Sequence, residues 1–506
     1  EEYSQDKAYI QGYEDLDELL LGNAYFARYK ADNSWQYSGA SGELYYPWIH
    51  VMADELSQQT GGKRNTWSVR GAGGTIYGYH TWQYRVYEDV EGKRVWDDGA
   101  DFRHLYSHIN ACNMILEETK AFENMEEEKD IQNVNRIKGE CYFLRGSYYF
   151  LLVNFYGKPY NAKTAENDPA VPIKVSNYVE DKYYKRNTVA EVYKQIISDL
   201  LEAETYLENI PKKSVWRADI NAVRLMLSRV YLYMSSYEEA KKYAALVTEY
   251  GPRLEDLNDF SGKEFLNADL SELIFSTGAS SLPGNVTFLS KNDTELGVIS
   301  GNDMRISDAL YEAYNPQDSI DLRLQHFIVN SEGSLRYKKL QGDVYETTDV
   351  SDVFLMRTAE AWLNLAEAAA CSEDEKMAKK ALNTLREKRI QRGAFNESEV
   401  NNLAGEALVL FIRKERQREL CLEGHRWFDL RRYQVAEKFP QNINVEHIFV
   451  YKEYNTSLYE YETLWTRKFV LTPGDPAWVL PLPKTEVDKN TGMLDNPRNE
   501  RTYENM

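Results

Sequence analysis

Residues 412–432 read IRKERQRELCLEGHRWFDLRR, a stretch in which charged and apolar residues are interleaved around one glycine. Glu415 and Glu419 lie four residues apart, which is the spacing of neighbours on one helix face. Gly424 supplies the left-handed backbone with which helices commonly end. The stretch therefore predicts a helix that contains several charge pairs and ends at Gly424. We expect its arginines and glutamates to hold this helix against the following segment.

Upstream of this stretch, apolar residues recur at three- and four-residue spacing, as on the buried face of an amphipathic helix. One such run opens at Thr188, which is placed to form a capping box with Glu191. Glycine and proline, which end helices, follow the periodic runs. The pattern predicts helices over about 101–118, over about 130–155, and from Thr188 to before Pro211.

Two further segments predict pairs of antiparallel helices. Residues 219–250 contain two periodic runs separated only by the turn at Ser235 and Ser236, and the pattern returns at 353–386. A helix–turn–helix of about 34 residues with small residues at the contact resembles tetratricopeptide repeats, although the Trp, Gly and Pro marks of that repeat are mostly missing. Scattered repeats and two ordinary helical hairpins both fit the sequence, and either gives a helical scaffold.

Three long segments, 30–100, 251–350 and 436–506, are rich in Gly, Asn, Ser, Asp and aromatic residues and lack a helical period. We expect them to form long loops with short strands. Loops of that length in a compact protein usually carry function, so the ligand site is expected there.

Composition narrows the classes of function. There are 80 acidic residues against 60 basic ones, a net charge of −20, which disfavours a general nucleic-acid binder because such proteins need a basic surface. No run of about 18 apolar residues occurs, so no transmembrane helix is expected. The cysteines show no CxxC pair and have apolar neighbours, which predicts buried thiols and no disulfide or metal site. They are Cys112, Cys141, Cys371 and Cys421.

The sequence offers no strong catalytic or metal-binding motif. The glycine cluster at 70–78 lacks the spacing of a dinucleotide or P-loop site. His104 and His108 lie one helical turn apart, but no third metal ligand accompanies them. No Gly-x-Ser-x-Gly motif occurs, and carboxylates are so abundant that a search for a glycosidase pair is uninformative. We therefore expect that the protein is not an enzyme and that it binds neither a cofactor nor a metal ion.

The stretch ERQRELCLEGHRWFDLRR at 415–432 closely resembles the helix signature of the RagB/SusD family of Bacteroidetes outer-membrane nutrient-binding lipoproteins. Residues 217–233 and 355–368 resemble the two repeat helices of that family. Residues 478–490, followed by Asp-Asn-Pro at 495–497, resemble its usual ending. These blocks occur in the order typical of the family.

The resemblance implies a mainly α, SusD-like fold, with tetratricopeptide-like helix pairs as scaffold and a loop-rich irregular region with short strands. Residues 1–250 would form the N-terminal part with the helical scaffold and the ligand region, and residues 251–506 the C-terminal part, both packed as one structural unit. The resemblance also implies a surface-exposed protein of the cell outer membrane with a lipid on an N-terminal cysteine. The sequence starts at Glu1 without that cysteine, so we expect it to be a trimmed mature form.

For function, the resemblance implies a protein that captures oligosaccharide or polysaccharide and hands it, uncleaved, to a SusC-like TonB-dependent transporter. The RagB branch of the family leaves capture of peptides as the alternative. Ligand-contacting loops vary within such families, so the resemblance assigns no binding residue.

Chemistry selects the candidate ligand residues. Sugar rings pack their C–H faces on aromatic planes, and their hydroxyls need amide, carboxylate or guanidinium partners. The segment 63–84 interleaves aromatic residues with glycines and polar residues outside any predicted helix, although a hairpin that buries one face also fits. We expect stacking platforms at Trp67, Tyr77, Tyr79 and Trp82, hydroxyl partners at Asn65, Arg70 and Gln83, and secondary contacts from Trp96 and Asp98.

Two further features bear on the ligand. The aromatic run at 451–465 is a competing surface, although it could equally pack on the 412–432 helix. Lys63, Arg64 and Arg70 place three positive charges near the expected platforms in a chain of net charge −20, which favours an acidic sugar.

Overall fold

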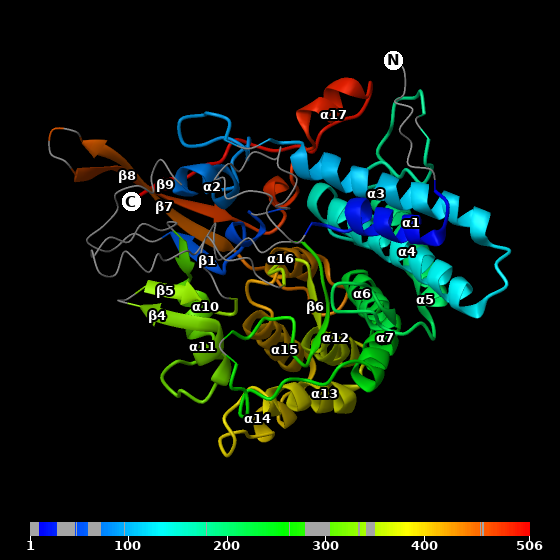
Figure 1. Ribbon diagram of the computed structural model, residues 1–506. Coiled ribbons are helices and arrows are strands. Elements are labelled where there is room, and N and C mark those ends of the chain that lie inside the picture. Colours follow the sequence, from blue (N-terminus) through cyan, green and yellow to red (C-terminus); the bar gives the residue numbers. More distant parts are fainter. Residues whose placement is uncertain are drawn as a thin grey trace.

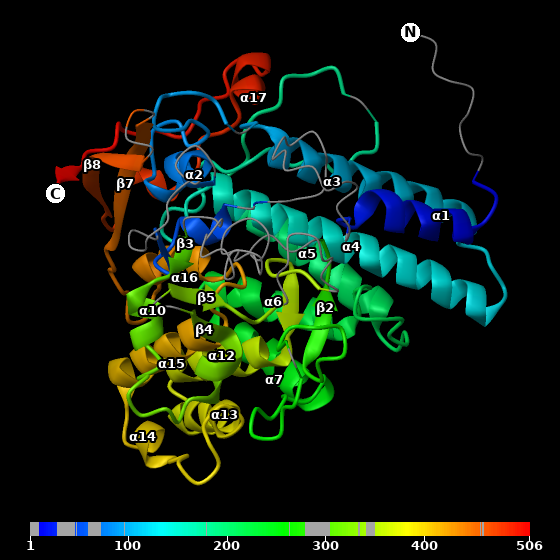
Figure 2. The ribbon, with the colours of Figure 1, turned by 60° about the vertical axis from the view of Figure 1, so that its left-hand side comes forward.

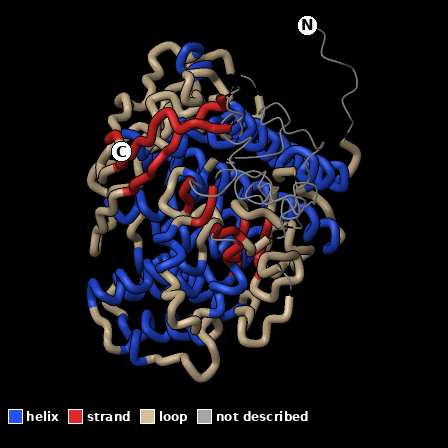
Figure 3. The backbone as a smooth tube through the Cα atoms, turned by 90° about the vertical axis from the view of Figure 1, so that its left-hand side faces the viewer, coloured by secondary structure: helices blue, strands red, loops and turns tan. Residues whose placement is uncertain are grey.

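The computed structural model shows a mainly helical body with small sheets (Figure 1, Figure 3), which confirms the predicted fold class. Among the residues that it describes, no helix combines the length and the apolar character needed to cross a bilayer. The described residues are 10–27, 46, 48–58, 72–95, 97–178, 180–262, 264–278, 304–331, 334–340, 350–455, 457 and 460–506.

Long helices form one side of the molecule (Figure 1). α3 (Ala100–Glu118) packs against α4 (Glu128–Tyr156), and α5 (Val189–Leu207) packs along α4. At the start of α5, the Glu191 amide donates to the Thr188 hydroxyl at 3.2 Å, and the Thr188 amide donates to the Glu191 carboxylate at 2.8 Å. The three predicted helices and the capping box are therefore confirmed.

Two helix pairs stack beside these long helices although they lie far apart in the sequence (Figure 2). α6 (Ile220–Tyr233) and α7 (Tyr237–Tyr250) form one pair, and α12 (Thr358–Cys371) and α13 (Glu375–Glu387) form the other. α12 packs against both α6 and α7, and its many buried alanines allow a close approach between the helices. Both predicted hairpins are confirmed, and their stacking favours the repeat-like interpretation.

One boundary of the second pair differs from the prediction. The periodic run starts at Val353, but β6 (Leu355–Arg357) is a strand that pairs antiparallel with β2 (Leu273–Ser276), and α12 starts only at Thr358. Both strands are buried along their whole length. A short buried apolar run fits a strand as well as a helix, so the partner strand decides between them.

The prediction of loops with short strands for 30–100 is wrong at α2 (Ala72–His80). Gly78 is needed in this helix because a Cβ atom there would lie 2.3 Å from the backbone oxygen of Val86. A glycine that suggested a loop therefore serves close packing, and the expectation that 63–84 lies outside any helix fails at α2.

The C-terminal segment carries a hairpin that is longer than the short strands expected for 436–506. β7 (Val445–Asn455) and β8 (Glu460–Leu471) pair antiparallel, with Phe449 opposite Arg467. The hairpin extends to the left of the helical body in Figure 1.

The other described elements are short and connect these units. The helices are α1 (Tyr13–Leu19), α10 (Asp308–Glu312), α11 (Leu322–Phe327), α14 (Ser398–Asn401) and α17 (Lys484–Lys489), with shorter helical turns at Leu20–Ala24, Ile49–Val51, Thr119–Phe122 and Pro476–Trp478. The strands are β1 (Leu56–Gln58), β3 (Met304–Ile306), β4 (Ile328–Ser331), β5 (Ser334–Tyr337) and β9 (Glu504–Asn505), which form the pairs β1–β3 and β4–β5 and the edge of β8.

The stretch that resembles the family signature forms the end of α15 (Gly405–Glu419), a tight turn, and α16 (Arg426–Val435). α15 ends before the predicted end at Gly424, which adopts a φ of +78° within the turn. Arg416 on α15 donates to Asp429 on α16 at 2.8 Å. Charged residues therefore hold the helix against the next segment, as predicted, but they do so in the interior.

A buried charge cluster surrounds the end of α15. Arg357 and Arg389 donate to Glu419 Oε1 at 2.5 and 3.0 Å. Arg323 donates to Glu419 Oε2 at 3.1 Å. These side chains come from β6, from the residues after α13 and from α11, so one carboxylate ties together elements that are remote in the sequence. We call this set the buried charge cluster: Glu272, Arg323, Lys339, Arg357, Arg389, Glu415, Glu419 and Glu423.

Attraction between the charges outweighs desolvation in this cluster. Burial alone would raise the pKa of Glu419, but the guanidinium groups of Arg389 and Arg357 hold this pKa well below its usual range. The pKa of Glu423 is also lowered, because Arg357 and Lys339 overcome the effect of its burial. Glu419 and Glu423 are thus ionised, and removing one partner leaves an uncompensated buried charge.

We predict that Glu419→Gln lowers the free energy of unfolding by about 3–5 kcal/mol, the usual cost of breaking a buried ion pair. Urea unfolding followed by circular dichroism measures this change. Asp488→Asn, which removes one partner of the exposed Lys484–Asp488 pair, is the control and should cost less than about 1 kcal/mol. Equal stability of Glu419→Gln and the wild type would contradict the structural role of the cluster.

Glu55 behaves in the opposite way. Its carboxylate accepts a hydrogen bond from the Leu422 amide at 3.1 Å in the turn after α15. Burial, followed by the charge of Asp54, raises the pKa of Glu55 to about 8. In the folded protein Glu55 is therefore largely protonated at neutral pH, whereas in the unfolded chain it ionises near its ordinary pKa of 4.5.

Because the folded state holds one more proton between these two pKa values, we predict that the free energy of unfolding falls as the pH rises from 5 to 8. The slope contributed by Glu55 is at most about 1.4 kcal/mol per pH unit. Glu55→Gln removes this contribution, and Glu118→Gln, at an exposed position, retains it. Denaturant unfolding at several pH values measures the slopes, and identical slopes for Glu55→Gln and the wild type would refute the assignment.

Candidate functional site

The three described rings among the expected platforms lie in the core. Tyr77, Tyr79 and Trp82 are exposed by only 9, 5 and 1%. Tyr79 stacks on Trp48 with ring centroids 4.2 Å apart, and Trp82 donates from Nε1 to the Met52 backbone oxygen at 2.9 Å. These rings are not available to stack on a ligand, so the prediction is wrong for them. The alternative that the sequence left open, a hairpin that buries one face, is also wrong where the chain is described, because Tyr77 and Tyr79 lie on the helix α2.

The remaining expected contacts divide into described and undescribed residues. Gln83 is half-buried and donates to the Thr81 hydroxyl at 2.9 Å. Asp98 accepts from Arg94 at 2.5 Å and from the Lys484 amide at 3.1 Å, so local protein groups engage its carboxylate. Trp67, Asn65, Arg70 and Trp96 lie outside the described residues and remain predictions, as do the charges of Lys63 and Arg64.

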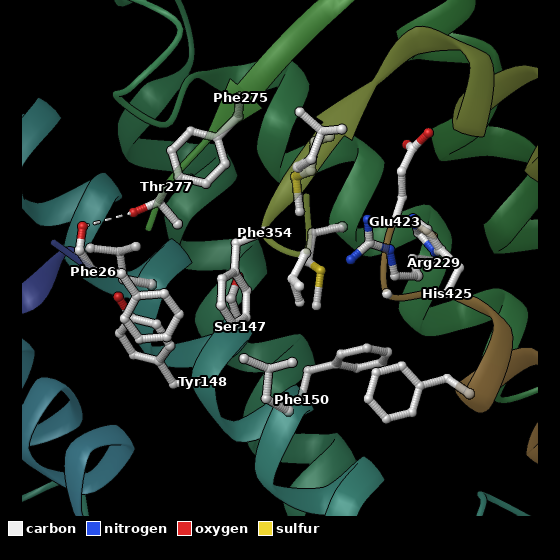
Figure 4. A pocket seen from close by; sticks show the side chains of 18 of the residues that line it. Phe26, Ser147, Tyr148, Phe150, Arg229, Phe275, Thr277, Phe354, Glu423 and His425 are labelled. Atoms are coloured by element: carbon white, nitrogen blue, oxygen red, sulfur yellow. Dashed lines mark hydrogen bonds between the residues drawn. The ribbon is translucent and has the colours of Figure 1, made fainter. Parts of the chain in front are cut away.

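A pocket lined mainly by aromatic and aliphatic side chains opens between α4, α6 and the β2–β6 pair (Figure 4). The space inside it that a water-sized sphere can occupy is about 70 Å³. The ring wall consists of Phe26, Tyr148, Phe275 and Phe354, with Phe150 and Phe428 beside it. The lining suits contact with the apolar face of one group of a larger ligand.

The rings of this wall support one another. Phe354 packs edge-on against Phe26, with centroids 4.6 Å apart, and Phe26 packs on Tyr148 at 4.9 Å. The Tyr148 hydroxyl donates to the Ala24 backbone oxygen at 2.5 Å, which fixes the ring. Phe26 and Tyr148 are buried, whereas Phe354 is half-buried and lines the pocket. Phe354 is therefore the ring of this wall best placed to meet a ligand.

Polar groups gather at the opposite end of the pocket, where Figure 4 shows Arg229, Glu423 and His425. Arg229 donates from Nε and Nη2 to Glu360 at 2.7 Å each, which holds its guanidinium in place. Burial, followed by nearby arginines, holds the pKa of His425 well below its usual range, so this imidazole is neutral.

Ser147 on α4 also lines the pocket. Its buried hydroxyl oxygen has no hydrogen-bond partner among the described residues. An unpaired buried hydroxyl costs free energy, and a ligand hydroxyl would satisfy it. The pocket thus offers ring faces and unused hydrogen-bonding capacity within one space.

Sequence reasoning missed this pocket. Its wall comes from residues near 26, 148, 275 and 354, which no single stretch of sequence brings together. The sequence did contain one indication of the pocket. Glu423 and His425, which line it, belong to the 415–432 stretch that resembles the family, in the turn after α15.

The cysteines and histidines that the sequence analysis considered as possible metal ligands lie in structural environments. The four cysteines are buried free thiols, as predicted. His108 Nδ1 lies 2.7 Å from the Asn23 backbone oxygen, and within the described part of the chain no cluster of His, Cys, Asp and Glu could hold a metal ion.

Comparison with solved structures supports the same fold. A candidate sugar-binding protein from Bacteroides vulgatus ATCC 8482 matches with 25% identity and a TM-score of 0.69, over 96% of this chain and 98% of that one. A SusD-like carbohydrate-binding protein from the same organism matches with 20% identity and a TM-score of 0.64, over 95% and 97%. Surface glycan-binding protein A from Bacteroides fluxus matches with 18% identity and a TM-score of 0.64, over 96% and 98%.

Family models match the two halves of the chain in turn. No curated protein matches the chain. The model "Starch-binding associating with outer membrane" matches residues 51–232, and the model "SusD family" matches residues 299–498. The second match contains the signature stretch and the ending that resemble the family, and the solved structures share the fold. The chain therefore belongs to the RagB/SusD family.

Proposed function

We propose that this protein captures oligosaccharide or polysaccharide at the cell surface without cleaving it and passes it to a SusC-like TonB-dependent transporter in the outer membrane. Support comes from the match to a model for starch-binding, outer-membrane-associated proteins and from the fold shared with proteins named for carbohydrate and glycan binding. In this proposal a lipid anchor holds the protein at the membrane surface.

The observation that carries the proposal is the pocket with a half-buried Phe354 at its ring wall and polar groups at its other end. A sugar has the same two-sided chemistry, since its C–H face packs on rings while its hydroxyls need hydrogen-bond partners. In this proposal the Ser147 hydroxyl and the Arg229 guanidinium, which line the same pocket, are those partners. A peptide would instead call for a pairing strand edge or charged pockets.

We predict that Phe354→Ala weakens binding of the recognised glycan by about tenfold or more, because the loss of one ring contact costs on the order of 1–2 kcal/mol. Phe354→Leu keeps an apolar side chain but loses the ring face, so it should also weaken binding. Isothermal titration calorimetry against neutral and acidic polysaccharides, with a peptide library in parallel, measures both effects.

Tyr178→Ala is the matched control, because Tyr178 is an aromatic residue 63% exposed that does not line the pocket. Thermal melting of each variant verifies folding. Binding to peptides with no heat from any glycan would contradict the proposal and support peptide capture. Release of new reducing ends on incubation with the bound glycan would contradict capture without cleavage.

A further inference from the structure

The β7–β8 hairpin carries rings and one arginine on the face turned toward α2. Trp465, Arg467 and Phe469 alternate along β8 and therefore share one face of the strand. Tyr77 on α2 packs against Phe449 and Phe469, with ring centroids 5.0 and 6.2 Å away. Tyr77 also lies 6.4 Å from Trp465 between ring centroids, so α2 covers part of this face, while Trp465 and Arg467 remain half-buried.

On the same face, an arginine lies over two aromatic rings. The guanidinium carbon of Arg467 lies 4.1 Å from the ring centroid of Trp465 and 3.9 Å from that of Tyr503. Tyr451 packs at a tilt on Trp465, with centroids 5.3 Å apart. Tyr503 is 46% exposed, and Tyr451, Trp465 and Arg467 are half-buried. We call Tyr451, Trp465, Arg467 and Tyr503 the hairpin surface.

Arg467 stands out because no described carboxylate neutralises it. It forms no ion pair within the described part of the chain, and its buried Nε has no hydrogen-bond partner there. Nearby Arg501 pairs with Asp475 at 2.8 Å, and Arg498 donates to backbone oxygens such as that of Val479 at 2.7 Å. In a chain of net charge −20, a fixed guanidinium without a counter-charge is an attractive place for an anion.

The charge is also arranged along the surface. The Tyr451 hydroxyl oxygen lies 3.0 Å from a carboxylate oxygen of Glu453 and 3.4 Å from one of Glu91, so negative charge gathers at that end. The opposite end holds Arg467, whose charge acts against the burial that raises the pKa of Tyr77. A ligand with an anionic group and an apolar face would therefore lie with its anion at Arg467 and its face on the rings.

We propose that the hairpin surface binds an anionic sugar residue, with its carboxylate or sulfate on the guanidinium of Arg467 and its C–H face on Trp465 or Tyr503. A guanidinium that is oriented by stacking can form paired hydrogen bonds to either anion. This inference rests on the proposed function, since it makes the hairpin a second glycan contact apart from the pocket, and it adds acidity as a property of the ligand.

The test titrates four probes: tetragalacturonate, its methyl ester, a κ-carrageenan tetrasaccharide and a neutral oligosaccharide that the wild type binds. Wild-type protein should bind at least one of the two acidic probes, and raising the salt concentration should weaken that binding. Arg467→Gln should reduce the affinity for that probe by about tenfold, as expected for the loss of a charged hydrogen-bonding partner. It should leave the neutral oligosaccharide unaffected.

One further variant separates the effect of the charge from that of the planar guanidinium, and another is a control outside the site. Arg467→Lys keeps the positive charge but loses the planar guanidinium group. Its affinity for the acidic probe should therefore lie between that of Arg467→Gln and that of the wild type. Arg392→Gln removes an exposed arginine that pairs with Asp259 elsewhere, and it should bind like the wild type. Thermal melting establishes that each variant is folded.

The outcomes distinguish this inference from the proposed function. If the wild type binds the neutral oligosaccharide but neither acidic probe, or if Arg467→Gln binds the acidic probe as tightly as the wild type, the hairpin site is overturned and glycan capture stands. Equal affinity for tetragalacturonate and its methyl ester overturns the carboxylate arm, and κ-carrageenan then decides the sulfate arm. If no glycan binds at all, the proposed function itself fails.

Discussion

Glu419 lies in the interior between the guanidinium groups of Arg323, Arg357 and Arg389, and the surrounding elements depend on this arrangement. A carboxylate taken out of water is costly unless opposite charges surround it, so the three arginines must reach the same point. They come from α11, from β6 and from the residues just after α13. The requirement to neutralise one buried charge thereby fixes how the C-terminal segments pack around the end of α15.

The same arrangement shapes the pocket. Glu423 accepts from Arg357 and Lys339 at 2.8 and 2.5 Å, which places the turn between α15 and α16. That turn presents Glu423 and His425 at the polar end of the pocket, while β6 continues from Phe354 at the ring wall. The family signature is thus a structural feature first, and it contributes to the site by positioning the backbone around it.

Sequence patterns foresaw the parts of the fold that depend on local periodicity. The capping box at Thr188 and the paired helices after Asp219 needed only neighbours in the chain. The start of α12 was misplaced because β6 is defined by β2, a partner strand that is remote in the sequence. α2 was missed because Gly78 is required by the close approach of the Val86 backbone, and no local sequence pattern reveals that contact.

The candidate site was harder to foresee for the same reason. Tyr79 and Trp82 have the composition of a sugar platform, but Trp48 and His447 cover them, and the sequence could not show those partners. The competing aromatic run at 451–465 proved to be part of the β7–β8 hairpin, where the Trp465 ring packs against the guanidinium group of Arg467. Residue type therefore indicated the kind of chemistry correctly, while tertiary contacts decided which rings a ligand can reach.

The most direct test of the central claim is a crystal structure of the protein with the oligosaccharide that binds it most tightly. The account predicts electron density for a sugar ring against Phe354, with hydroxyls toward Ser147 and Arg229. A well-ordered oligosaccharide elsewhere on the protein, with the pocket left without sugar density, would contradict it.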